Sequence, residues 1–178
     1  MSSFYTTLLG LPKAPAPNDD ISRIKGSCSD EVKQACVNAL AHYGVGGPGV
    51  YGNEFTRHLT LVCADVRPRM FAPEGTEKRG LEAEVTFEIE VYPSMLNAMG
   101  SIGGGCLCHL LEICTWGSWY AIAAVTGVDP AGISQALELK FYAPAFIGMK
   151  LAIVSTSMTA KGKLVFGRAE VRGAGLCH

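Results

Sequence analysis

The chain has 178 residues, of which 48% are hydrophobic and 17% charged, and its formal net charge is −1. This composition can bury a sizeable core and excludes wholesale disorder, while the length predicts a single domain. The near-neutral charge argues against a nucleic-acid partner, because a protein that binds phosphates needs an excess of basic residues.

The chain divides into two segments. Residues 1–28 are rich in proline and predict an extended tail. Residues 29–178 predict the folded domain, which begins with a helix over 29–43. Ser29 is the expected N-cap of this helix, because a serine side chain accepts a hydrogen bond from the first helical turn.

Alternating apolar and polar residues predict strands downstream, with one long apolar helix at 104–125 between the second strand and the third. The glutamates of the expected strand 80–91 all fall on one side, which is typical of a solvated sheet face. Together the elements predict an α+β fold in which an antiparallel sheet wraps one buried helix. The expected strands are 57–66, 80–91, 132–142, 149–159 and 163–172.

The helix at 104–125 is apolar enough to suggest a membrane span, but His109 and Glu112 lie near its middle. A carboxylate there is costly in lipid, and the flanks lack the usual lysine or arginine anchors. A helix buried inside a protein explains the same composition, so no membrane span is expected.

Three consecutive glycines, 103–105, lead into this helix. Backbone N–H groups at a helix N-terminus are unsatisfied, and glycine lets a ligand approach them closely. Such a site would stabilise a carbonyl oxygen that gains charge. Glu112 lies seven residues beyond Gly105, close to two helical turns, and could act as general base or nucleophile. The alternatives are a plain tight turn and a buried Glu112 paired with a partner such as His109.

The seven cysteines are odd in number and form no Cys-x-x-Cys pair, which favours reduced thiols in a cytosolic protein. No signal peptide is visible, so we expect a cytoplasmic protein, with the mitochondrion as the open alternative. We expect no metal, because Cys106 and Cys108 point to different sides of the helix that carries His109 and Glu112.

The glycine-rich segment fits a longer pattern. Asn-x-x-Gly-x-x-His-Gly-Gly, followed by an acid seven residues later, is matched by Asn97, Gly100, Gly104, Gly105 and Glu112. A second pattern, Gly-x-Ser-x-x-x-x-x-x-(aromatic)-x-x-Pro, is matched by Gly132, Ser134, Tyr142 with a one-residue variation, and Pro144. A basic turn before the last strand is matched by Lys161-Gly162-Lys163. Over roughly residues 55–173 the chain therefore resembles the hotdog-fold acyl-CoA thioesterases of the phenylacetate-degradation and thioesterase-superfamily-member-2 type.

The resemblance implies a hotdog fold with five to six strands, a homodimer or homotetramer, no cofactor, and hydrolysis of an acyl-CoA or related acyl thioester. It implies that Asn97 orients the water or the loop and that Ser134 positions water near Glu112 across a dimer interface. The implied catalytic residues are Glu112, Asn97, Gly105 and Ser134, and the implied substrate-binding residues are Gly103, Gly104, Trp116, Lys161 and Lys163.

One position departs from the pattern, because Gly103 stands where the family carries histidine. This leaves two alternatives open. The protein could be another hotdog enzyme acting on an acyl or polyketide thioester, with a hydratase or cyclase-like activity. It could also be a catalytically inactive protein that binds an acyl ligand.

Overall fold

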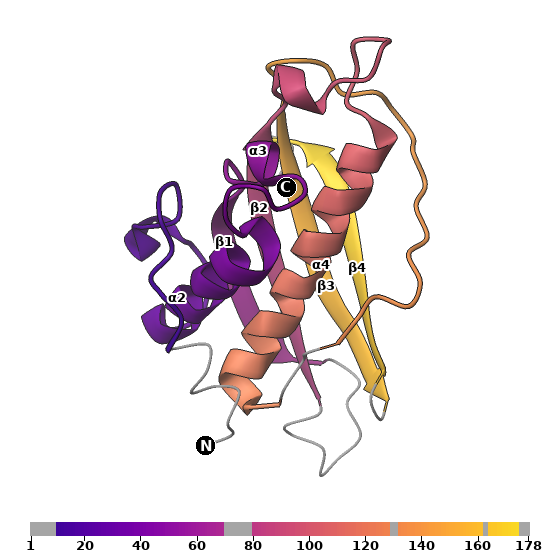
Figure 1. Cartoon of the computed structure of the whole chain (residues 1–178). Coiled ribbons are helices and arrows are strands. Elements are labelled where there is room, and N and C mark those ends of the chain that lie inside the picture. Colours follow the sequence, from indigo (N-terminus) through magenta and orange to yellow (C-terminus); the bar gives the residue numbers. More distant parts are fainter. Residues whose placement is uncertain (1–9, 70–79, 129–131, 162–163, 175–178) are drawn as a thin grey trace.

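The computed structural model describes residues 10–69, 80–128, 132–161 and 164–174. One antiparallel sheet forms a layer, and the long helix α4 (Gly104–Thr126) lies across one of its faces (Figure 1). A shorter helix, α2 (Asp30–Ala39), packs beside α4. The predicted α+β arrangement around one long helix is confirmed.

The sheet has four strands within the described residues, and each pairs antiparallel with the next in chain order. The expectation of five to six strands is therefore wrong for this part of the chain. The strands are β1 (Thr60–Pro68), β2 (Leu81–Glu90), β3 (Lys150–Lys161) and β4 (Leu164–Gly173).

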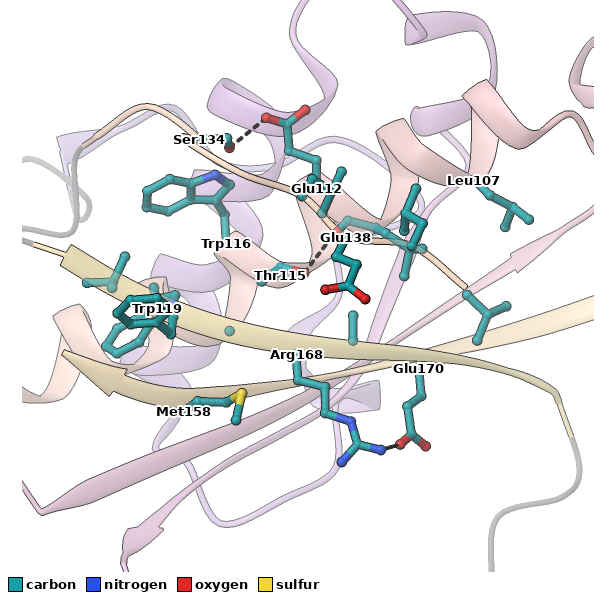
Figure 2. Close-up of a pocket in the computed structure, with 18 of the residues that line it drawn as sticks. Leu107, Glu112, Thr115, Trp116, Trp119, Ser134, Glu138, Met158, Arg168 and Glu170 are labelled. Atoms are coloured by element: carbon teal, nitrogen blue, oxygen red, sulfur yellow. Dashed lines mark hydrogen bonds and ion pairs between the residues drawn. The ribbon is translucent and has the colours of Figure 1, made fainter. Parts of the chain in front are cut away.

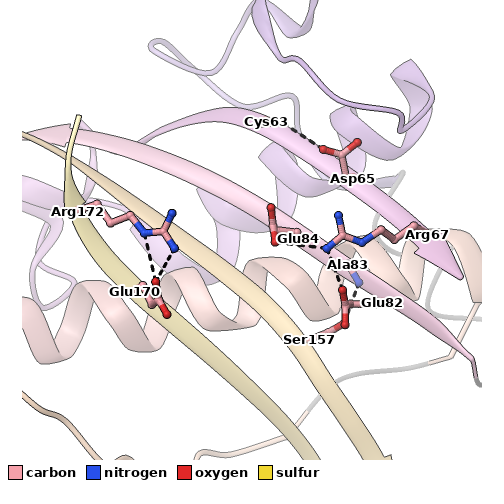
Figure 3. Close-up of polar contacts among 9 residues, drawn as sticks. All are labelled: Cys63, Asp65, Arg67, Glu82, Ala83, Glu84, Ser157, Glu170 and Arg172. Atoms are coloured by element: carbon pink, nitrogen blue, oxygen red, sulfur yellow. Dashed lines mark hydrogen bonds and ion pairs between the residues drawn. The ribbon is translucent and has the colours of Figure 1, made fainter. Parts of the chain in front are cut away.

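The alternating side chains of β2 separate the core from solvent. Ala83, Val85, Phe87 and Ile89 are buried on the helix side, as period-two patterning predicts. On the outer face, Arg67 of β1 forms ion pairs with Glu82 at 3.0 Å and Glu84 at 3.6 Å (Figure 3). Glu170 of β4 pairs there with Arg168 and Arg172. The charged outer face agrees with the predicted solvated surface.

Helix α4 begins after Gly103 and ends where Gly127 takes a left-handed conformation, with φ of 72°. Its buried side includes Leu110, Cys114, Gly117 and Ala121. Gly117 lets the helix pack closely on β2, since an added Cβ would overlap the ring of Phe87. Within the described residues, no helix combines the length and apolarity that crossing a membrane requires.

Segment 132–142, expected as a strand, is extended but pairs with none of the described strands. Ser134 lies beside Glu112 and the ring of Phe141 lies over Gly104, so the segment runs back along α4 in the opposite direction (Figure 1, orange). Alternation indicates an extended backbone, but a strand also needs a neighbour at hydrogen-bonding distance. None of the described strands is such a neighbour, and Leu137 and Phe141 are exposed.

The N-terminal segment packs against the edge of β1. The side chain of Asn18 donates to the Leu59 carbonyl at 2.8 Å and accepts from the Leu61 N–H at 2.9 Å. Residues 10–28 of the expected tail thus supply hydrogen-bond partners to backbone groups that would be unpaired at the edge of the sheet. The predicted helix follows as α2, with Ser29 as its N-cap, and continues in a π-helical stretch. The other short elements are η1 (Ile21–Arg23), η2 (Leu40–Val45, the π-helical stretch), α3 (Asn53–Thr56) and η3 (Pro93–Met95).

Candidate functional site

The loop before α4 is held together by the side chain of Asn97. Its Oδ1 accepts from the backbone N–H of Met99 at 2.9 Å and of Ser101 at 3.4 Å, and its Nδ2 donates to Ser101 Oγ at 3.1 Å. Gly100 completes the turn with a φ of 77°, which favours glycine. The amide is thus occupied within the loop, which fits an Asn that shapes the turn.

The N-terminus of α4 is open. Gly103, the N-cap, offers no side-chain hydrogen bond to the first turn, and Gly104 and Gly105 are exposed. A Cβ added at Gly105 would meet no atom within 4 Å. The free N–H groups of the first turn and the helix dipole together make this a place where a partly negative oxygen is stabilised.

Glu112 and Ser134 meet in the structure. Ser134 Oγ donates to Glu112 Oε1 at 2.7 Å, joining the extended segment to the middle of α4 within one chain (Figure 2). Glu112 is half-buried and Ser134 is exposed. The carboxylate therefore has a fixed hydroxyl partner and remains within reach of water.

The helix places Glu112 and Gly105 on one side. Seven residues correspond to about 10.5 Å along the axis and a rotation only about 20° short of two turns. Helical side chains lean toward the N-terminus, which brings the Glu112 carboxylate closer to the N–H groups.

A cavity of about 2030 Å³ opens on this side of α4, between the helix, the extended segment and β4. Glu112, Ser134 and Trp116 all line it (Figure 2). The Trp116 ring stacks on Tyr120, with centroids 6.4 Å apart. The structure thus places three of the predicted site residues around one cavity.

The cavity wall extends beyond the predicted site residues. Trp119 of α4 and Met158 and Phe166 of the β3–β4 pair also line the cavity. Trp119 carried a usable signal, because it follows Glu112 by seven residues and so shares its helix face. The strand residues carried none, because only the tertiary fold brings β4 beside α4.

His109 does not pair with Glu112. Its ring packs edge-on against Tyr51 and Phe55, with centroids 4.9 and 5.8 Å away. Gly52 lies against the same imidazole and adopts a φ of 76°. Nε2 of His109 is buried and has no hydrogen-bond partner among the described residues. The alternative of a Glu112–His109 pair is therefore wrong.

The cysteines beside the site are free. Burial raises the pKa of Cys106 to about 11 and raises that of Cys114 well above its ordinary value. Both are therefore neutral thiols near pH 7 and poor nucleophiles. In the part of the chain that the structure describes, no three histidine, cysteine or acidic side chains converge as metal ligands would.

The basic turn stays a prediction. Lys161 is the last residue of β3, and Lys163 lies outside the described residues.

Comparison with known proteins rests on structure. No protein-family model matches the sequence, and no curated protein matches it significantly. Thioesterase superfamily member 2 from zebrafish matches with a TM-score of 0.53 and 17% identity, over 77% of this chain and 83% of that one. The E. coli PaaI protein of the phenylacetic acid degradation operon matches with a TM-score of 0.43 and 20% identity, over 51% of this chain and 65% of that one. The TT0310 protein from Thermus thermophilus matches with a TM-score of 0.40 and 16% identity, over 62% of this chain and 80% of that one. With its long helix on an antiparallel sheet, the chain has the hotdog fold, shared with zebrafish thioesterase superfamily member 2.

Proposed function

We propose that this protein hydrolyses an acyl-CoA or related acyl thioester. The observation that carries the proposal is the Ser134–Glu112 hydrogen bond in the wall of the large cavity, on the helix whose first turn exposes Gly104 and Gly105. A carboxylate, a hydroxyl and free backbone N–H groups are the groups that acyl transfer needs.

In the proposed reaction, the N–H of Gly105 donates to the carbonyl oxygen of the thioester. Glu112 takes a proton from a water molecule whose oxygen bonds to the carbonyl carbon, and the carbon–sulfur bond then breaks. The proton passes to the departing thiolate, which leaves as the thiol. Alternatively, a Glu112 oxygen bonds to the carbonyl carbon and the carbon–sulfur bond breaks, which releases the thiolate. Water then hydrolyses the mixed anhydride, which restores the Glu112 carboxylate and supplies the proton that the thiolate takes up. Ser134 holds the carboxylate in place in either route.

The cavity supports a role for a second copy of the chain. About 2030 Å³ is roughly twice the volume of a large small-molecule pocket, so an acyl group alone leaves much of it unfilled. The extended segment beside it exposes large apolar side chains, including Ile133 and Tyr142 at 85% and 90%. Exposed apolar patches mark interaction surfaces. We therefore propose a homodimer or homotetramer, to be tested by light scattering at micromolar concentration.

The function is tested with a panel of acyl-CoAs and the variant Glu112→Gln, which keeps the shape but removes the base. We expect hydrolysis by the unmodified protein and a loss of at least about 100-fold in kcat for the variant. Glu138→Gln is the matched control, because Glu138 is an exposed carboxylate on the same cavity. Full activity of Glu112→Gln would overturn the assigned base. Binding without turnover of any thioester would instead indicate a protein that only binds acyl ligands.

A further inference from the structure

A second, smaller cavity lies between the N-terminal segment (residues 10–28) and the π-helical stretch η2. Its volume is about 230 Å³, and it shares no lining residue with the large cavity. The sheet order places β1, on which the N-terminal segment packs, at the opposite edge from β4. Figure 1 shows the N-terminal segment (indigo) and the extended segment (orange) on opposite sides of the molecule. The small cavity is therefore separate from the proposed catalytic site.

Three basic side chains from separate segments line the small cavity. They are Lys13 of the N-terminal segment, His42 of η2 and Arg57, which directly follows α3. No aspartate or glutamate is among the lining residues. Lys13 and Arg57 form no ion pair with any residue that the structure describes. In a protein whose net charge is −1, this local concentration of positive charge attracts an anion.

Arg57 keeps most of its donors free. Its Nε donates to Nε2 of the neighbouring His58 at 3.3 Å. This contact uses one of the five guanidinium N–H groups, and the terminal nitrogens have no partner among the described residues. The terminal N–H groups form a planar fork that matches two oxygens of a phosphate or carboxylate. Lys13 adds a compact positive charge with three further donors.

Asn18 is a buried polar residue in the wall of the small cavity, with only 8% of its surface exposed. Its Nδ2 donates to the Leu59 carbonyl at 2.8 Å and its Oδ1 accepts from the Leu61 N–H, so the orientation of the amide is fixed. An amide nitrogen carries two hydrogens. The second one has no acceptor within the described part of the chain, so Asn18 can offer a neutral donor to a bound anion.

We propose that the small cavity binds a phosphate group, held by Lys13 and Arg57 with His42 as a third donor. Two permanent positive charges match a phosphate, which carries close to two negative charges at pH 7, better than a carboxylate, which carries one. Pro12, Pro15 and Val45 add apolar wall, which suits a small organic body attached to the phosphate. Two sources supply such a group: a small phosphorylated compound, and the nucleotide end of CoA. The proposal goes beyond the proposed function and does not require it.

The test titrates inorganic phosphate into the full chain at constant ionic strength and follows binding by phosphorus NMR. We expect saturable binding, and we expect Lys13→Gln and Arg57→Gln each to raise the Kd about tenfold, because a hydrogen bond to a charged group is lost. Both side chains are exposed, so the variants should fold. Lys150→Gln is the matched control, since Lys150 is an exposed lysine of β3 that lines neither cavity.

Three results would overturn the proposal. These are binding that does not saturate, an unchanged Kd in the Lys13 and Arg57 variants, and acetate binding as tight as that of phosphate. Arg57→Lys, which keeps the charge but loses the fork, should bind phosphate with intermediate affinity.

CoA and dephospho-CoA, which lacks the 3′-phosphate, distinguish the two sources. If CoA supplies the group, it binds more tightly than dephospho-CoA, and Arg57→Gln removes that difference and raises KM for acyl-CoA hydrolysis. If a separate phosphorylated compound supplies the group, Arg57→Gln loses phosphate binding while kcat and KM stay unchanged. Either result supports a phosphate site. If no thioester is hydrolysed, the proposed function fails, while the phosphate titration still decides whether the small cavity binds phosphate.

Discussion

Ser134 Oγ donates a 2.7 Å hydrogen bond to Glu112 Oε1, across 22 residues of sequence. The bond connects an exposed segment, which pairs with none of the described strands, with the central helix of the fold. It thereby sets both the direction of the Glu112 carboxylate and the path of the segment that closes one side of the cavity.

Removal of the Ser134 hydroxyl should affect activity more than stability. We expect Ser134→Ala to lower kcat about tenfold, because a hydrogen bond to a charged group is worth about 1.5 kcal/mol. Thermal unfolding should change little, since Ser134 is exposed. Steady-state kinetics and a melting curve measure the two effects. Ser134→Thr keeps a hydroxyl and should retain part of the rate, whereas an Ala variant as active as the unmodified protein would contradict the role of Ser134.

Gly103→His restores the histidine of the family pattern, and the structure has room for it. Gly103 has a φ of −69°, and a Cβ there would lie 3.5 Å from the Met95 carbonyl oxygen, an ordinary contact. We expect the variant to fold with stability within about 0.5 kcal/mol and to hydrolyse thioesters at the same or a higher rate. Values of kcat and KM for this variant and for Gly103→Ala check this. A collapse of substrate binding would show instead that the substrate occupies this space.

Gly117→Ala should destabilise the fold. The added methyl would lie 2.5 Å from Phe87 Cζ and 2.8 Å from Phe87 Cε2, where α4 packs on β2. Overpacking of this kind costs about 1–3 kcal/mol. Urea unfolding gives the free energy directly. Gly105→Ala is the control for stability, because its methyl meets no atom within 4 Å and alanine favours helix. Equal stability of the two variants would mean that the helix can shift away from Phe87.

Tyr120 should make the protein sensitive to alkali. Burial, with a smaller contribution from Tyr43, raises the pKa of Tyr120 from 10.0 to about 12. The folded state therefore holds this proton more tightly than the unfolded state. The contribution of Tyr120 to the free energy of unfolding is fully present below pH 10 and is lost as the pH rises toward 12. We expect Tyr120→Phe to flatten the fall in unfolding free energy over that range. An unchanged slope, or early ionisation of all tyrosines followed by ultraviolet absorbance, would contradict the assignment.

The sequence predicted the parts of the fold that depend on local patterning. Strict alternation located β2, and a long apolar run with glycines before and after it located α4. The same alternation failed at residues 132–142, because it reports an extended backbone and cannot say whether another strand lies alongside. Glu112 and the glycines before α4 could be predicted because one helix relates them by its own geometry. The same helical spacing relates Trp119 to Glu112.

What the sequence determined by itself was a helix that carries a carboxylate two turns from an open, glycine-lined N-terminus. Helical periodicity fixes that relationship wherever the helix is placed. Only the tertiary structure decided that Ser134, rather than His109, is the partner of Glu112, and that β4 forms the far wall of the cavity. Those contacts join segments distant in the chain, and their geometry follows from how the helix, the sheet and the extended segment pack together.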